Sequence, residues 1–161
     1  MSSSTAYPLG MLGLVLLGVG ELLHIIGLST PEWSVYSSIR VGLWEACNPT
    51  CQQYILKPAE VEVCEAFAII GMLAGLLAAA LGLMFFVLTL ANKSVRLLAI
   101  GAAVAANVAL ISILVCVIVW GAAVHPGGIV KIGYSFALSI AGGIIHSLGG
   151  DIIFIMSRQH S

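Results

Sequence analysis

Residues 33–51 read WSVYSSIRVGLWEACNPTC. This stretch places two tryptophans and two cysteines in the one long polar segment of a chain that is otherwise strongly apolar. Long apolar runs flank it on both sides, so the segment is best understood as a loop between helices. The role of this loop depends on whether the flanking helices lie in water or in lipid, and the composition decides between the two.

The composition points to lipid as the solvent. Of 161 residues, 60 % are hydrophobic and only 8 % are charged, with a mean hydropathy of +1.12, whereas soluble domains carry about a quarter charged residues. Each apolar run reaches the roughly 20 residues that a membrane-spanning helix needs, and none alternates as a barrel strand would. The four runs are Pro8–Leu28, Ala66–Leu90, Leu97–Val124 and Tyr134–Met156.

The sequence therefore predicts an all-α membrane protein, a four-transmembrane-helix bundle, as one domain over residues 1–161. The first run follows an uncharged segment and is longer than a typical signal-peptide core, so we expect it to be retained. Four helices place both termini on one side and the loops at 29–65 and 125–133 on the other. Basic residues are divided equally between the two sides, so the positive-inside rule does not orient the chain. Paired exposed cysteines persist in oxidising compartments, which predicts outward-facing loops and cytoplasmic termini at the plasma membrane.

The first loop has the composition of a small sheet. Val35–Val41 has the β-branched and aromatic bias of a strand, and Gln53–Leu56 is a second short candidate. Asn48-Pro49-Thr50 between the cysteines is typical of a tight turn.

The loop cysteines leave more than one pairing open. A Cys47–Cys51 disulfide would clamp two strands where they turn back, although so short a ring contributes little chain entropy. Alternatively, Cys64 is the partner of one of them. Metal binding by the three cysteines lacks a convincing fourth ligand. Cys116, deep in the third apolar run, is expected to be a small buried hydrophobe.

Trp33, Gly42-Leu43-Trp44, Cys47 and Cys51 form a W…GLW…C…C pattern. It resembles the first extracellular loop of the claudin superfamily, which includes claudins, peripheral myelin protein, epithelial membrane proteins and the calcium-channel γ and stargazin-like subunits. The resemblance extends over the whole chain, through Cys51-Gln-Gln-Tyr54, Pro58, His125-Pro126 and Gly133-Tyr-Ser-Phe136. It implies a small extracellular β-sheet formed by the first loop.

In that family the motif tryptophans pack under the sheet and seat it on the bundle. The resemblance implies the same for Trp33 and Trp44, with Leu43 buried between them, while generic anchoring at the membrane interface is the alternative. This chain also departs from the family. Its two cysteines are closer together and the loop is shorter, and the tail after Met156 lacks the ending that binds PDZ scaffolds.

Two functions are compatible with this resemblance. The first is a claudin-like cell–cell contact protein that contributes to a paracellular barrier or selective gap, located at cell junctions and self-associating within and between membranes. The second is an auxiliary subunit that modulates an ion channel or receptor. Candidate contact residues are Tyr36, Ile39, Ile129 and Val130. Candidate residues for ion selectivity are Glu45, Glu60 and Glu62, since carboxylates favour cations, although solvated acids that begin the second helix are the simpler interpretation.

Four ionisable residues lie in the apolar runs, where charge is costly. Glu21 and His24 are three residues apart on one helix face, so we expect them to form a local hydrogen-bonded pair. Asp151 is expected to meet the interface or Arg158. A proton or ion relay that continues through His146 to Asp151 is the functional alternative.

No signature of catalysis accompanies these residues. The chain has no nucleophile–base pair, phosphate-binding glycine loop or metalloprotease motif, and no basic patch for nucleic acid. We therefore expect no enzyme activity, no cofactor and no metal, and membrane lipid as the surrounding partner.

Overall fold

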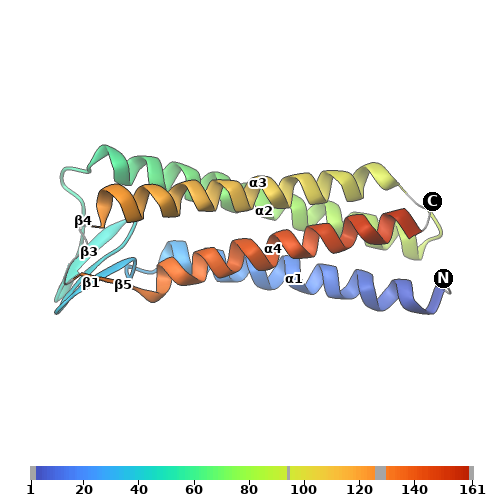
Figure 1. The fold of residues 1–161 in the computed structure, drawn as a ribbon, viewed down its shortest axis with the longest axis horizontal. Helices are drawn as coiled ribbons and strands as arrows, with labels where there is room; N and C mark the ends of the chain where they lie inside the picture. The colour runs from blue at the N-terminus through green and yellow to red at the C-terminus, as the bar shows by residue number, and fades with distance from the viewer. Residues whose placement is uncertain (1–2, 94, 126–129, 160–161) are drawn as a thin grey trace.

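The structure is a computed structural model that describes residues 3–93, 95–125 and 130–159. Four long helices form a bundle with a small sheet at one end and both termini at the other (Figure 1). The helices are α1 (Ser3–Ser29), α2 (Ala59–Leu90), α3 (Arg96–Val119), which the π-helical turn η1 (Trp120–Val124) extends, and α4 (Tyr134–Gln159). Each contains a stretch long and apolar enough to cross a membrane, which confirms the predicted fold class.

The predicted helix bounds hold closely except at two starts: α1 begins at Ser3 rather than at residue 8, and α2 begins earlier by a larger margin. This helix begins at Ala59 rather than at residue 66, and Glu60 and Glu62 lie in its first turn. Acidic side chains are favourable at a helix N-terminus, so they extend the helix although their charge would be costly in lipid. The resulting 32 residues span about 48 Å against about 30 Å of hydrocarbon. We therefore expect the first turns of α2, which carry these acids, to extend beyond the hydrocarbon on the sheet side.

The sheet has five short antiparallel strands in the order β4-β3-β2-β1-β5. They are β1 (Ser34–Tyr36), β2 (Ile39–Val41), β3 (Glu45–Asn48), β4 (Thr50–Gln53) and β5 (Lys131–Ile132). Two predictions were wrong. The segment 35–41 is a hairpin that turns at Ser37, whose φ is +52°, and residues 54–56 follow the last strand of the loop instead of forming one.

Helix α1 packs most extensively against α4, and α2 against α3. Small residues face each other along the α1–α4 contact in antiparallel order: Gly13 and Gly149, Gly20 and Gly142, and Gly27 and Ser135. The pairs recur every seven residues, close to two helical turns. A Cβ added at Gly20 would lie 2.5 Å from the His146 backbone nitrogen and 2.6 Å from the Gly142 oxygen. The two backbones therefore approach as closely as glycine permits.

Candidate functional site

Trp33 is the centre of the contact between sheet and bundle. Its side chain is completely buried, and its indole N–H donates to the Gly27 carbonyl of α1 at 2.9 Å. The ring lies against Trp120 and Phe136, with centroids 5.2 and 5.8 Å away. One side chain thus joins β1 to α1, η1 and α4.

The Gly42-Leu43-Trp44 turn forms the rest of this contact between the sheet and the bundle. Leu43 is fully buried, and the Trp44 indole donates to the Leu28 carbonyl at 2.6 Å. A Cβ at Gly42 would lie 2.5 Å from the Pro31 Cα, so only glycine fits there. The motif residues named from the sequence therefore come together at the sheet end. Both tryptophans fix the sheet through specific hydrogen bonds in addition to their position near the interface.

Two further aromatic residues complete this contact: Tyr54, which the sequence offered only as part of the Cys51-Gln-Gln-Tyr54 run, and Trp120, which the sequence analysis did not name. The Trp120 indole donates to the Ser34 hydroxyl at 3.0 Å, and the Tyr54 hydroxyl donates to the Gly42 carbonyl at 2.6 Å. Burial raises the pKa of Tyr54 to about 12, and the charge of Glu65 adds to the shift. Tyr54 therefore stays a neutral donor that ties the end of the loop to the motif turn.

The structure contains the Cys47–Cys51 disulfide. It links paired positions of β3 and β4 across the turn at Pro49. The alternative partner, Cys64, is a free thiol buried in α2, and Cys116 is likewise free and buried. Ligand atoms of Glu45, Cys47 and Cys51 lie within 4.8 Å of one another, but sulfurs in a disulfide offer no thiolate to a metal.

Replacing both Cys47 and Cys51 by serine is expected to lower the free energy of unfolding by at most about 2 kcal/mol, because the closed ring is short. The bond clamps only the β3–β4 hairpin, so the helices should stay folded. Thermal unfolding in detergent, followed by circular dichroism with and without reductant, measures this. Reductant should leave the double serine variant unchanged, and loss of the helical signal on reduction of the wild type would contradict the expectation.

The predicted contact residues differ in exposure. Tyr36 is 43 % exposed, while Ile39 and Val130 are half-buried, and Ile129 lies outside the described residues. The most exposed apolar side chains of the loop were missed: Ile55 and Leu56, between β4 and α2, are 95 % and 90 % exposed. Two consecutive aliphatic residues before Lys57-Pro58 were interpreted as the end of a strand, although they project from the sheet.

The acidic residues of the loop divide into paired and unpaired groups. Glu32 pairs with Arg40 at 3.1 Å, and the Lys57 ammonium contacts both carboxylate oxygens of Glu65 at 2.6 and 2.8 Å. The three acids predicted to influence ion selectivity, Glu45, Glu60 and Glu62, make no ion pair within the described part of the chain. Glu45 is half-buried on β3, and the other two are exposed on α2.

The intramembrane pairing predicted for Glu21 and His24 is wrong. A Glu21 carboxylate oxygen lies 3.9 Å from Nδ1 of His146 on α4. His24 instead places Nε2 3.1 Å from the Ala68 carbonyl of α2. Residues three apart share a helix face, but each of these side chains turns toward a different neighbouring helix. Both cross-helix contacts connect α1 to the bundle.

Gly71 and Gly75 make room for these polar groups. A Cβ at Gly71 would lie 3.4 Å from His24 Nε2, and one at Gly75 would collide with the Glu21 carboxylate. The spacing that is typical of close helix contact therefore accommodates polar side chains here. Among the described residues, Glu21 Oε1, His24 Nδ1 and His146 Nε2 are buried without a hydrogen-bond partner.

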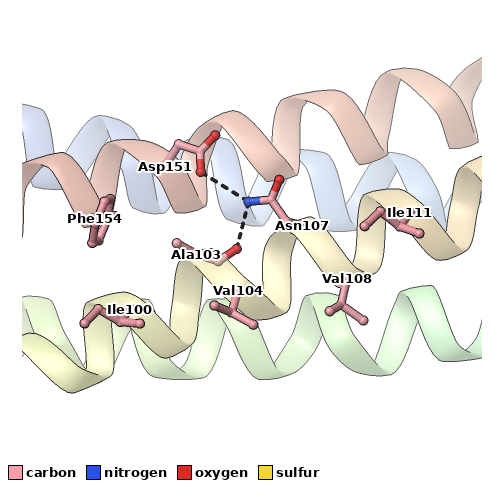
Figure 2. Close-up of a pocket in the computed structure, with 8 residues that line it drawn as sticks. All are labelled: Ile100, Ala103, Val104, Asn107, Val108, Ile111, Asp151 and Phe154. Atoms are coloured by element: carbon pink, nitrogen blue, oxygen red, sulfur yellow. Dashed lines mark hydrogen bonds between the residues drawn. The ribbon is translucent and has the colours of Figure 1, made fainter.

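Asp151 belongs to a separate polar cluster between α3 and α4. Asn107 donates its side-chain amide to an Asp151 carboxylate oxygen at 3.2 Å and to the Ala103 carbonyl at 2.9 Å, as Figure 2 shows. Ser147 donates to the Asn107 oxygen at 3.2 Å. The predicted contact between Asp151 and Arg158 is absent from the described residues, because the Arg158 guanidinium stacks on the Phe154 ring at 4.9 Å.

No hydrogen bond or ion pair connects His146 to Asp151 within the part of the chain that the structure describes. His146 places Nδ1 2.8 Å from the Leu17 carbonyl of α1, while Asp151 faces α3. The predicted relay thus lacks a continuous path. The two intramembrane clusters are distinct sites on different helix pairs.

Comparison with known proteins adds no relative: no family model matches the chain, and no curated protein matches its sequence. The resemblance to claudins therefore rests on the residues and segments quoted from the sequence, chiefly those of the W…GLW…C…C motif. Of these, Trp33, Leu43 and Trp44 together form the seat of the sheet. Their arrangement at the sheet end is an observation on this chain alone.

Proposed function

We propose that the protein is a claudin-like cell–cell contact protein of the plasma membrane. In this proposal the sheet end faces outward, since exposed disulfides persist in oxidising compartments, and both termini are cytoplasmic. The outer surfaces of the loops meet other copies and shape a barrier or selective gap between cells. The observation that carries the proposal is the pair of exposed aliphatic side chains at Ile55 and Leu56.

We expect lipid not to cover these two side chains. They precede Ala59, the first residue of α2. Ala59 in turn lies six residues before Glu65, about 9 Å further toward the sheet along the helix. Glu65 and Lys57 form an ion pair, and because charge is costly in hydrocarbon we expect the boundary of the hydrocarbon to lie further inward. Exposed apolar surface outside the membrane is unfavourable unless a partner buries it.

The opposite edge of the sheet offers a complementary apolar surface. Strands β4 and β5 are the two edges, and Ile55 and Leu56 follow β4. On the other side, Ile132 of β5 is 53 % exposed and Tyr36 of the neighbouring β1 is 43 % exposed. Contact between different edges of two copies is heterologous, and where its rotation does not close a ring it continues into open rows. Such rows fit a junctional role, with Glu45, Glu60 and Glu62 favouring cations in the gap.

The test is expression in cells that lack junctional strands, with freeze-fracture imaging and transepithelial ion permeability measured on the same layers. Strands together with altered permeability support the proposal. Delivery to the surface without strands and without a permeability change counts against it. That result would favour an auxiliary subunit of a channel or receptor.

Replacing Ile55 and Leu56 together by serine is expected to reduce enrichment at cell–cell contacts several-fold. The change removes the exposed apolar surface and leaves every buried contact in place. Fluorescence of the tagged protein at contacts, relative to free membrane, measures the effect. The matched control replaces Gln52 and Gln53, the exposed polar neighbours, by serine. Equal enrichment of the test variant and wild type would remove this surface from the proposal.

A further inference from the structure

A groove lies on the outer surface of the bundle between α3 and α4 (Figure 2). Its volume is about 460 Å³. Val104 and Ile111 on its α3 side are 58 % and 61 % exposed, so the groove opens where lipid tails or another helix would lie. The lining residues are Ile100, Ala103, Val104, Asn107, Val108, Ile111, Asp151 and Phe154.

The polar groups at the floor of the groove, those of Asn107 and Asp151, have only part of their hydrogen-bonding capacity used. Asn107 uses its amide group on Ala103 and on one carboxylate oxygen of Asp151, and its oxygen accepts from Ser147. The second carboxylate oxygen of Asp151 has no hydrogen bond within the described residues. Asn107 therefore fixes the orientation of Asp151 without neutralising it.

No cation of the described chain reaches this carboxylate. Arg158 lies seven residues further along α4, about 10 Å away along the axis, and is engaged with Phe154. Arg96 is the first residue of α3, and Asn107 lies about 16 Å further along that helix. Acidic residues in membrane spans usually pair with a cation or a polar partner, and here the partner has to come from outside.

We propose that this groove binds a transmembrane helix of another protein, with a Lys or Arg of that helix paired to Asp151. The apolar lining from Ile100 to Ile111 extends over about 16 Å, which suits three turns of an apolar helix. The carboxylate at its floor supplies a specific anchor, since opposite charges attract strongly in a low-dielectric medium. The chemical class of the partner is thus an apolar membrane helix with one basic residue at the depth of Asp151.

Two other occupants fit less well. A lipid tail would fill the apolar part of the groove but bring neither a cation nor a hydrogen-bond donor to Asp151. A second copy, parallel in the same membrane, would present Arg158 about 10 Å away from Asp151 along the axis, nearer the end that carries the termini. Its membrane-embedded histidines, His24 and His146, are 2 % exposed and face the bundle interior. The inference does not depend on the proposed role of the outer loops.

The test uses the full chain in phosphatidylcholine vesicles with model transmembrane helices of leucine and alanine. Energy transfer between labelled protein and labelled helix reports binding. One helix carries a single lysine at the depth of Asp151, a second carries leucine there, a third carries glutamate, and a fourth has its lysine two turns nearer the sheet end. We expect the first helix to bind at least tenfold more tightly than the other three.

Asp151→Asn is expected to reduce binding of the lysine helix to the level of the leucine helix. The matched control is Glu62→Gln, which removes one negative charge from an exposed position outside the membrane and should change nothing. The comparison of the two lysine helices at different depths uses only the wild-type protein. It therefore still tests the proposal if Asp151→Asn fails to fold.

Three results would overturn the proposal. Equal binding of the lysine and leucine helices would mean apolar packing without recognition. Full binding of the lysine helix by folded Asp151→Asn would place its site elsewhere. Energy transfer between copies of the wild type that disappears in Asp151→Asn would identify a second copy as the occupant.

Discussion

Gly20→Ala is expected to lower the free energy of unfolding by about 2 kcal/mol, as overpacking of a tight contact does. The added Cβ would lie 2.5 Å from the His146 nitrogen and 2.6 Å from the Gly142 oxygen. Both atoms belong to the α4 backbone, so no side-chain rotation relieves the clash and the helices must separate. Separation would also stretch the hydrogen bond between His146 and the Leu17 carbonyl. Reversible unfolding in mixed micelles, followed by circular dichroism, measures the loss.

Gly18 provides a matched control two residues away on the same helix. A Cβ there would meet nothing within 4 Å, so Gly18→Ala should be neutral or stabilising by up to about 1 kcal/mol from helix propensity. Gly142→Ala, the reciprocal change on α4, should resemble Gly20→Ala. The double variant should cost less than the sum, because both methyl groups separate the same two helices. Equal stability of the Gly18 and Gly20 variants would contradict the close α1–α4 contact.

Patterns local in the sequence predicted the fold well. The apolar runs gave four helices because length and composition alone decide whether a segment spans lipid. The segment 35–41 was misjudged because its β-branched residues have the same propensity in one strand as in two. Only the pair Ser37-Ser38 marks the turn, and serine is a weaker turn signal than glycine or asparagine.

Contacts between helices were the part that sequence could not supply. Glu21 and His24 are neighbours on α1 by spacing, yet their closest partners are on α4 and α2. Which helices adjoin depends on the glycine pairs of α1 and α4 acting together, a relation between segments more than a hundred residues apart. Likewise, the room that Gly75 leaves for Glu21 is visible only once α1 and α2 are placed together.

Trp33→Ala is expected to lower the free energy of unfolding by about 3–5 kcal/mol, as removal of a fully buried large aromatic side chain does. The indole fills the space between β1 and the bundle, contacts Trp120 and Phe136, and donates to the Gly27 carbonyl. Its loss leaves a cavity and an unsatisfied carbonyl at once. Unfolding in mixed micelles gives the magnitude, and limited proteolysis of the first loop shows whether the sheet detaches before the helices unfold.

Two variants separate the contributions of Trp33. Trp33→Phe keeps an aromatic ring but removes the N–H donor, so it should cost clearly less than alanine, with about 1 kcal/mol from the lost hydrogen bond. Tyr36→Ala removes a 43 % exposed aromatic residue of β1, the strand that follows Trp33, and it should cost less than about 1 kcal/mol. A Trp33→Ala loss as small as that of Tyr36→Ala would mean that the sheet is seated by the Gly42-Leu43-Trp44 turn alone. Faster proteolysis of Trp33→Ala with unchanged helix unfolding would confine the role of Trp33 to the sheet.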